Sequence, residues 1–250
     1  MIAAIIQARM GSSRLPGKVL MSIHGKPFLH HIVDRLSMSQ DVEKIIIATS
    51  SSPQNNKIAE LAKELEVSLF RGSEDDVLDR YYKSAKKFKV NDIVRITADS
   101  PLLDPQMVDK VVKMYIDSKN IYDYVSNIHP PSFPDGLDVE VFSFDVLERA
   151  WKEAKKSYER EHVTPYMWEN PEKFRVGNYS EGLDYSNLRL TLDDPKDLRL
   201  IKIVYENLYQ KNKNFNFADI LDFLKLNPEL ANINKDLGRY EGFIKSKELS

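Results

Sequence analysis

The stretch IAAIIQARMGSSRLPGKVL, residues 2–20, joins an apolar run to a loop rich in cations and small residues. Residues 2–8 are almost continuously apolar, which is typical of a strand that is buried on both faces of a parallel sheet. In α/β proteins, ligands usually bind at the carboxyl end of such a strand. The stretch therefore predicts an α/β fold with a ligand site in its first loop.

The first loop carries the groups that bind an anion, namely Arg9, Gly11, Ser12, Ser13, Arg14, Gly17 and Lys18. Glycines let backbone N–H groups converge on negative oxygens, and the cations, with no carboxylate among them, would repel one another without an anion. We therefore expect a polyphosphate here. The spacing differs from the P-loop, because five residues separate the two glycines and Val19 follows the lysine. A solvated loop is the alternative.

Strand-like runs alternate with amphipathic helical segments along the rest of the chain. Further strands are predicted at 43–49, 67–70, 92–97, 122–126, 136–144, 174–179 and 188–192. Helices are predicted at 26–39, 57–65, 75–88, 106–118, 144–156, 159–170, 194–208 and 217–224, and Pro165 is expected to kink or restart the helix at 159–170. This alternation predicts a mostly parallel central sheet with helices on both faces. We expect one domain, 1–250, with a core of about 1–210, a helical tail at 211–250, and a frayed lysine-rich end.

The composition narrows the class of protein. Lys and Arg total 36 and Asp and Glu total 38, so no global field favours nucleic acid or an anionic membrane. The chain has no cysteine, which suits a cytoplasmic protein. No apolar run approaches the roughly 18 residues that a membrane span needs, and Met1 leads directly into a strand. We expect a soluble, intracellular protein.

Six segments together resemble one known family. They are residues 5–20, RGSEDDVLDR at 71–80, ITADSPLLDP at 96–105, FPDGLDVEVF at 133–142, EREHVTPY at 159–166 and LTLDDPKDL at 190–198. They are similar to the sugar-activating nucleotidyltransferases, in particular the cytidylyltransferase family of the 3-deoxy-manno-octulosonate and acylneuraminate enzymes, and most of all its SpsF-like branch. The resemblance implies the three-layer, Rossmann-like fold of nucleotide-diphospho-sugar transferases.

The reaction that this resemblance implies is attack of an acceptor oxygen on the α-phosphorus of a nucleoside triphosphate, with pyrophosphate leaving. The negative charge of the triphosphate must be offset by cations and N–H dipoles, and a divalent metal must be held by carboxylates. We assign Arg14 and Lys18 to catalysis, and Arg9, Gly11, Ser12 and Ser13 to nucleotide binding.

Two aspartates are candidate magnesium ligands. Asp99 follows the predicted strand 92–97, at the same sheet edge as the first loop, and the resembling family has a metal aspartate at the matching position. Asp193 matches the second metal carboxylate of the family. Its neighbour Asp194 is assigned to capping the helix that opens at Pro195. Mg²⁺ is preferred over Zn²⁺ because the candidates are all carboxylates. An Asx-turn is the alternative role for Asp99.

The nucleotide base is expected near the end of the first strand. In relatives, the segment that matches 71–80 contacts the base and ribose, which points to Arg80. Gln7 and Ala8 can read the base through backbone groups, and Thr97 can line the same pocket. Asp76 and Arg80 are equally an i, i+4 pair on a helix surface.

Acceptor binding is assigned to later motifs. Asp138 and Glu140 would share one strand face, where neighbouring carboxylates repel unless a cation or sugar hydroxyls engage them. A solvated outer face is the alternative. In the motif EREHVTPY, Arg160 and His162 are assigned to an acceptor phosphate or carboxylate, although a lone helical histidine is more often structural.

The sequence thus predicts a magnesium-dependent nucleotidyltransferase that activates a sugar or sugar acid with CTP for surface-polysaccharide synthesis. Residues 71–80 and the first loop depart from the octulosonate and sialate enzymes, so the acceptor and the base stay open. A sugar-1-phosphate guanylyl- or other nucleotidylyltransferase, a glycosyltransferase of related fold, and a non-catalytic nucleotide-binding protein are the alternatives. A glycosyltransferase would usually have an Asp-x-Asp motif, which residues 99–101 lack. A homodimer is implied only by the resemblance.

Overall fold

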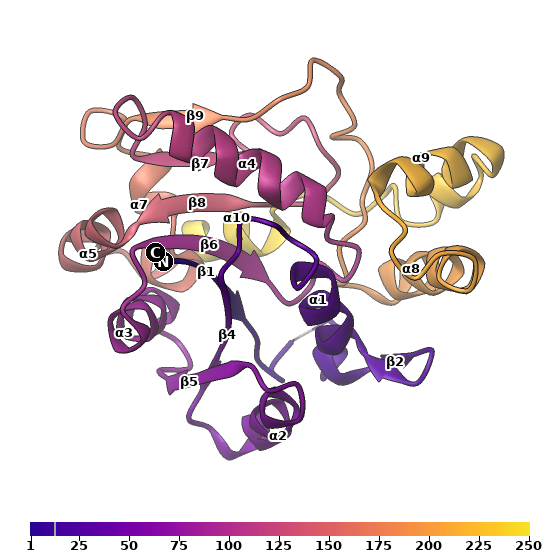
Figure 1. Cartoon of the computed structure of the whole chain (residues 1–250), viewed down its shortest axis with the longest axis horizontal. Helices are drawn as coiled ribbons and strands as arrows, with labels where there is room; N and C mark the ends of the chain where they lie inside the picture. The colour runs from indigo at the N-terminus through magenta and orange to yellow at the C-terminus, as the bar shows by residue number, and fades with distance from the viewer. Residues whose placement is uncertain (13) are drawn as a thin grey trace.

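The computed structural model describes residues 1–12 and 14–250, so Ser13 lies outside the described residues. Within them, the central sheet has seven strands in the order β5-β4-β1-β6-β8-β7-β9 (Figure 1). In chain order these are β1 Ile2–Gln7, β4 Lys44–Ser50, β5 Ser68–Gly72, β6 Asp92–Thr97, β7 Tyr124–Ser126, β8 Glu140–Ser143 and β9 Val176–Asn178. Two short strands, β2 Ser22–Ile23 and β3 Lys26–Pro27, form a separate hairpin.

The sheet is mostly parallel, as predicted. β5, β4, β1 and β6 pair in parallel, and β7 pairs with β9 in parallel. Within the described chain, β8 alone runs the other way, antiparallel to both β6 and β7. The carboxyl ends of β1 and β6 consequently meet at one edge of the sheet, the position where ligands bind in this fold class.

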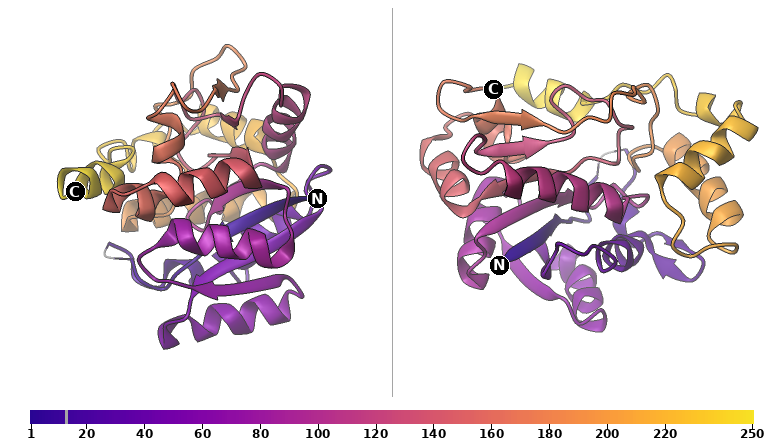
Figure 2. Two further views of the ribbon diagram at one scale, coloured as in Figure 1. Left: turned by 90° about the vertical axis from the view of Figure 1, so that its left-hand side faces the viewer. Right: turned by 45° about the horizontal axis from the view of Figure 1, so that its top comes forward.

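Helices cover both faces of the sheet (Figure 2). The helices are α1 Phe28–Leu36, α2 Asn56–Glu64, α3 Val77–Phe88, α4 Pro105–Asp117, α5 Phe144–Glu153, α6 Ser157–His162, α7 Pro165–Trp168, α8 Pro195–Leu208, α9 Phe217–Leu226 and α10 Glu241–Glu248, with short 3-10 turns at Lys18–Leu20, Pro53–Asn55 and Leu230–Asn232. Apolar residues of α1, α2, α4, α8 and α9 share one core cluster, and those of α3, α5 and α7 share the other.

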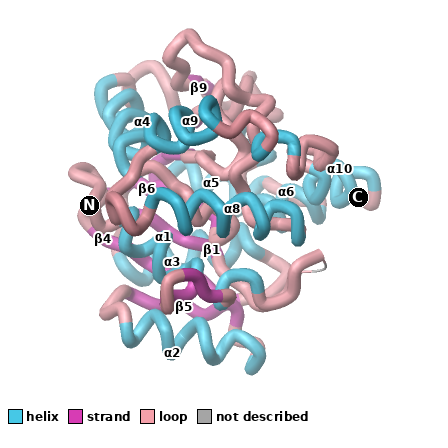
Figure 3. The backbone as a smooth tube through the Cα atoms, turned by 90° about the vertical axis from the view of Figure 1, so that its right-hand side faces the viewer, coloured by secondary structure: helices cyan, strands magenta, loops and turns pink. Residues whose placement is uncertain are grey.

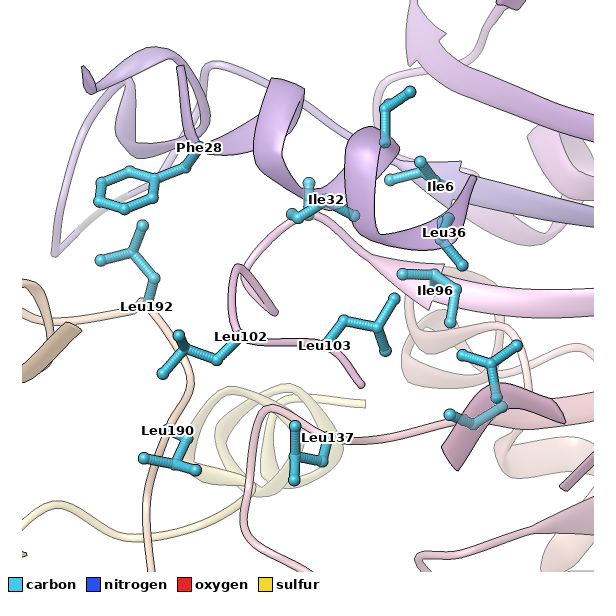
Figure 4. Packing of buried hydrophobic residues seen from close by; sticks show 14 of the residues in the cluster. Ile6, Phe28, Ile32, Leu36, Ile96, Leu102, Leu103, Leu137, Leu190 and Leu192 are labelled. Carbon is cyan, nitrogen blue, oxygen red and sulfur yellow. The ribbon is translucent and has the colours of Figure 1, made fainter. Parts of the chain in front are cut away.

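The side chains of β1 point alternately into two apolar cores, which explains why its sequence is continuously apolar. Ala4 and Ile6 enter the first core cluster, whereas Ala3 and Ile5 enter the second, because successive side chains of a strand point to opposite faces. All four side chains are fully buried. Figure 4 shows the first cluster, in which residues of α1 pack against strand and loop residues, with Phe28, Ile32, Leu36, Ile6, Ile96, Leu102, Leu103, Leu137, Leu190 and Leu192 labelled.

Two predictions of regular structure are corrected. Residues 188–192 form no strand and share only an isolated bridge, Asp135 to Arg189. The strand predicted at 136–144 is confined to β8, because the chain at Gly136 (φ 100°) lies against the backbone of Leu190 and Thr191, where a Cβ would come within 2.5 Å of backbone atoms. The helix predicted at 159–170 does restart at Pro165, as expected: α6 ends at His162, Val163 has φ 74°, and α7 begins at Pro165.

The C-terminal end is a helix rather than frayed chain. α10 lies beside α6, near the point where the chain ends (Figure 3). The helix is described over its whole length, and none of its residues is buried. Across the described residues, we find no helix with the length and hydropathy that a membrane crossing would need.

Candidate active site

A cavity of about 650 Å³ opens at the carboxyl ends of β1 and β6. Its walls come from the first loop, the end of β6, the chain before β8, the segment before α8, the helices α6 and α7, and α10. The candidate residues that line it are Gln7, Arg9, Gly11, Ser12, Arg14, Lys18, Thr97, Asp99, Asp138, Glu140, His162 and Asp193. The fold therefore brings together most of the residues that the sequence singles out.

The first loop turns back on itself at Gly17. This glycine has φ 71°, a left-handed conformation that side chains disfavour, and its N–H donates to the carbonyl of Met10 at 3.0 Å. A 3-10 turn starts directly afterwards at Lys18, whose side chain is buried in the cavity wall. The amide of Met10 donates to the side chain of Asn55 at 2.8 Å, which fixes the loop to the rest of the fold.

Lys18 joins the two aspartates. Its Nζ pairs with Asp193 and lies 3.6 Å from Oδ2 of Asp99. Arg14 also pairs with Asp193, at 3.0 Å. The chain before α8 is fixed beside β6 because the N–H of Leu192 and the hydroxyl of Thr191 both donate to the carbonyl of Asp99, at 2.8 and 3.1 Å. Two aspartates that are distant in sequence thus contact one ammonium group.

The electrostatics of Asp99 favour a carboxylate. Burial raises its pKa, but the ammonium of Lys18, a hydrogen bond from Thr97 and the charge of Arg95 together lower it by more, so the net pKa lies below the usual value. Asp99 is consequently ionised at neutral pH, as a metal ligand must be.

The two aspartates fit Mg²⁺. Both carry oxygen donors, which Mg²⁺ prefers, and both already contact one positive group. In the part of the chain that the structure describes, no group of three or more His, Cys, Asp or Glu residues forms a complete metal site. Mg²⁺ is commonly held by one or two carboxylates, with substrate phosphates and water as the other ligands.

Asp194 caps α8, as predicted. Its side chain accepts from the N–H of Lys196 at 2.9 Å, and it forms a capping box with Asp197. The fully buried carboxylate of Asp197 accepts from the N–H groups of both Asp193 and Asp194, at 3.0 Å each. These bonds leave the side chain of Asp193 free to face the first loop.

Arg189 is a site residue that the sequence analysis missed. Its guanidinium pairs with the buried Asp197 at 2.9 Å and with Asp135 at 2.7 Å, and it donates to the carbonyl of Gly238 at 3.1 Å. It thereby joins the start of α8 to the chain before α10. The spacing of Asp194 and Asp197 is a pattern typical of a helix N-cap and can be detected in the sequence. No sequence pattern indicates that Arg189 lies in the site.

A second, smaller cavity of about 90 Å³ lies next to the first and is lined by Gln7, Ala8, Arg9, Val77, Arg80, Glu161 and His162. Arg80 is 1% exposed, donates to the carbonyl of Ser73 at 2.8 Å, and has no hydrogen-bond partner for its Nε among the described residues. Burial lowers the pKa of its guanidinium. A donor without a partner is thus buried in the wall of a small pocket, which suits contact with a ligand.

The alternative role for Arg80, a surface pair with Asp76, is wrong. Asp76 instead caps α3 by accepting from the N–H of Asp79 at 2.9 Å, and it pairs with Arg160 at 2.6 Å. The prediction that Arg160 contacts the acceptor is not supported by its position. Arg160 joins α6 to α3 and does not line either cavity.

His162 lines both cavities. Its Nε2 lies 3.1 Å from the hydroxyl of Ser246 in α10. Burial lowers the pKa of His162 to about 4, so the ring is neutral at physiological pH. A neutral ring can exchange a hydrogen bond with an acceptor, but it supplies no positive charge for an acceptor carboxylate.

Asp138 and Glu140 are not on a solvated outer face, so that alternative is wrong. Glu140 is 3% exposed and pairs with Arg95 at 2.9 Å. Asp138 precedes β8 and pairs with Arg239 at 2.6 Å. Burial raises the pKa of Asp138 to about 7, and Arg239 offsets only part of the rise. Two carboxylates are therefore held in the cavity wall by half-buried arginines.

The remaining candidates have local partners. Gln7 accepts from Arg95 at 3.1 Å through its side chain, and the hydroxyls of Thr97 and Ser100 lie 3.3 Å apart. Arg9 lies 3.8 Å from Glu161. The candidates Ser12 and Ala8 also have local partners. The hydroxyl of Ser12 accepts from the N–H of Leu15 at 3.3 Å, and the N–H of Ala8 donates to the carbonyl of Ala48 at 3.2 Å.

One wall of the main cavity was not predicted at all. It comes from the C-terminal segment, through Gly238, Tyr240, Glu241, Gly242, Phe243, Lys245 and Ser246. Glu241 accepts a hydrogen bond from Arg14 of the first loop. The lysine-rich composition of this segment gave no signal that it would fold back over the site.

A family model described as Cytidylyltransferase matches residues 3–227. The uncharacterized protein MJ1063 of Methanocaldococcus jannaschii is 43% identical over 239 residues, which cover 94% of this chain and 95% of that protein. The spore coat polysaccharide biosynthesis protein SpsF of Bacillus subtilis is 32% identical over 237 residues, which cover 92% and 96%. A solved cytidylyltransferase structure from Leptospira borgpetersenii matches with a TM-score of 0.88 and 33% identity, covering 96% of this chain and 99% of that one. The chain is therefore a nucleotidyltransferase that belongs to the cytidylyltransferase family.

Proposed function

We propose that the protein uses CTP and Mg²⁺ to activate a sugar or sugar acid, and that it releases pyrophosphate. The observation that carries this proposal is the meeting of Lys18, Asp99 and Asp193 at one sheet edge, beside a loop that is rich in cations. The triphosphate would lie along this loop, where Arg14 and Lys18 offset its charge. The same cations raise the electrophilicity of the α-phosphorus by withdrawing charge from its oxygens.

Asp99 and Asp193 would hold the metal ion. When bound there, Mg²⁺ supplies a Lewis acid that polarises the phosphate oxygens and helps an acceptor hydroxyl to lose its proton. Asp197 and the carbonyl of Asp99 hold the two chain segments in place through the backbone bonds described above. If the acceptor is a sugar phosphate, no general base is needed.

The cytidine ring would enter the small cavity. This cavity is about 90 Å³ and shares part of its lining with the main cavity. Arg80 and Ala8 both line it, so the Arg80 guanidinium and the Ala8 backbone are the groups that would contact the base or ribose.

The acceptor would occupy the opposite part of the main cavity, where Asp138 and Glu140 can accept hydrogen bonds from sugar hydroxyls. The name of the Bacillus subtilis relative supports a role in surface-polysaccharide synthesis. A homodimer and a cytoplasmic location belong to the same proposal, because the resembling family implies the dimer and the cysteine-free composition suits the cytoplasm.

The test is an assay of pyrophosphate release with CTP, UTP, ATP and GTP, each against a panel of sugars, sugar acids and sugar phosphates. We expect release with CTP and Mg²⁺ and loss of release after chelation of the metal. Release that is fastest with GTP would favour a guanylyltransferase. Consumption of a nucleotide sugar without pyrophosphate release would overturn the proposal in favour of a glycosyltransferase.

A further inference from the structure

The helix α10 brings a carboxylate into the loop that is assigned to phosphate binding. Glu241, in the first turn of α10, accepts a hydrogen bond from one guanidinium nitrogen of Arg14, while the other nitrogen pairs with Asp193 at 3.0 Å. Glu241 also lines the main cavity. The carboxylate thus occupies a partner position on Arg14 that a phosphate oxygen would otherwise take.

Weak contacts hold α10 over the cavity. Within this fully described helix, none of the residues is buried. Besides Glu241, its contacts with the body include an ion pair from Lys247 to Glu169 at 2.6 Å and hydrogen bonds of Ser246. The half-buried ring of Phe243 lies 5.8, 5.4 and 5.5 Å from the rings of Tyr158, His162 and Trp168. Exposed ion pairs contribute little to stability, and a helix without buried apolar side chains opens at low cost.

The contact between Glu241 and Arg14 is electrostatically unfavourable when a triphosphate is bound at the first loop. The polyphosphate brings several negative charges to the first loop, and Arg14 must then pair with phosphate oxygens. Glu241 would lose its partner and lie beside like charges. Asp193 has an alternative partner in the metal ion. Lys18 cannot replace Arg14 as the partner of Glu241, because it already contacts Asp99 and Asp193.

We propose that Glu241 competes with the triphosphate for Arg14, and that α10 moves away from the first loop when the nucleotide binds. The inference rests on the proposed function, since it takes the first loop as the triphosphate site. Glu241 therefore sets the affinity of the enzyme for its nucleotide, and α10 opens and closes the nucleotide end of the cavity.

The first test compares Glu241→Gln with Glu248→Gln. Both remove one negative charge from α10, but Glu248 does not line the cavity. A glutamine at 241 can still accept from the N–H of Gly238, which donates to Glu241 at 2.8 Å. Binding of Mg²⁺–CTP and of inorganic tripolyphosphate is measured by calorimetry. We expect Glu241→Gln to bind both about two- to fivefold more tightly at low salt, with Glu248→Gln unchanged. The gain shrinks as salt is added.

The second test follows α10 itself. Trp168 contacts Phe243, and the only other tryptophan in the sequence is Trp151, so Trp151→Phe leaves a single fluorescent reporter beside α10. We expect Mg²⁺–CTP to change Trp168 emission and to speed tryptic cleavage after Lys245 and Lys247. Tripolyphosphate should have the same effects.

Two results would overturn the inference. One is equal or weaker ligand binding by Glu241→Gln relative to Glu248→Gln. The other is unchanged Trp168 emission and proteolysis at saturating ligand. The proposed function fails separately, when tripolyphosphate binds more tightly to Glu241→Gln but CTP has no preference over other nucleotides and yields no pyrophosphate. In that case the competition stands and the cytidylyl assignment falls.

Discussion

Two opposite walls of the cavity differ in how the fold supports them. The wall at the first loop rests on β1 and β6, whose side chains are buried on both faces of the sheet. The wall at α10 rests on a helix without a buried residue along its described length. The rigid wall carries the groups assigned to the chemistry, and the weakly held wall carries groups that can control entry. Fixed geometry is needed where bonds change, and mobility is needed where substrates enter and leave.

The largest effect is expected on the rigid wall, for Asp99→Asn. We expect loss of turnover by about 10³-fold or more, because one of the two metal carboxylates is neutralised while the shape is kept. Pyrophosphate release measures it, and thermal unfolding confirms that the fold is intact. Asp194→Asn is the matched control, since asparagine also caps helices and the same charge is removed at the neighbouring position. Equal activity of the two variants would refute the metal assignment.

Arg80→Met tests whether a residue of the smaller cavity serves binding rather than stability. Removing a buried cation with an unpartnered Nε should leave the free energy of unfolding unchanged or raise it. The KM for CTP should rise by about 10-fold, from the loss of one hydrogen bond to the ligand. Steady-state kinetics and urea unfolding provide the two measurements. A variant that loses stability but keeps its KM would assign Arg80 to the fold alone.

Asp138 lines the same cavity, and its raised pKa leads to a prediction of how the free energy of unfolding depends on pH. Its pKa of about 7 in the folded protein lies above the ordinary value, so the folded state binds a proton more tightly than the unfolded state does. This contribution to stability is fully present below about pH 4 and is lost as the pH rises through 7, at no more than about 1.4 kcal/mol per pH unit. Asp138→Asn should make this decline shallower, while Asp135, whose pKa burial raises to about 6, keeps a decline of the same sign. Urea unfolding at pH 5, 6 and 7 measures it, and an unchanged slope would contradict the assignment.

The smallest effect is expected from removal of the weakly held wall. A chain that ends at Tyr240 keeps the pair between Arg239 and Asp138 but lacks α10. Because the apolar surface lost is mainly that of the half-buried ring of Phe243, we expect the free energy of unfolding to fall by only about 1–2 kcal/mol. By contrast, Ile6→Ala in the rigid wall should cost about 2–5 kcal/mol. Thermal and urea unfolding compare them. If truncation lowered the free energy of unfolding as much as Ile6→Ala does, α10 would not be weakly held, and the two walls would not differ in how the fold supports them.

The sequence predicted the rigid wall well because its signals are local. The apolar run of β1, the cations of the first loop and the capping pattern of Asp194 each depend on neighbouring residues. Parallel strands then bring Asp99 to the same edge. The family resemblance, rather than any local pattern, supplied Asp193.

The other wall could not be predicted in this way. The position of α10 depends on contacts between distant residues, such as Glu241 with Arg14 and Ser246 with Glu161. The pairing of Arg160 with Asp76, the N-cap of another helix, is a long-range contact of the same kind. Asp138 and Glu140 alternate as they would on a solvated strand, and only the arginines beside them make their burial possible.

The reversed direction of β8 has a consequence for how such enzymes diversify. β7 ends and β8 begins at the cavity, so the connection 127–139 starts and finishes at the same edge of the sheet. Its length and composition can change without shifting the register of either strand. Exchange of this connection between relatives offers a route to new acceptor preferences on an unaltered nucleotide-binding framework.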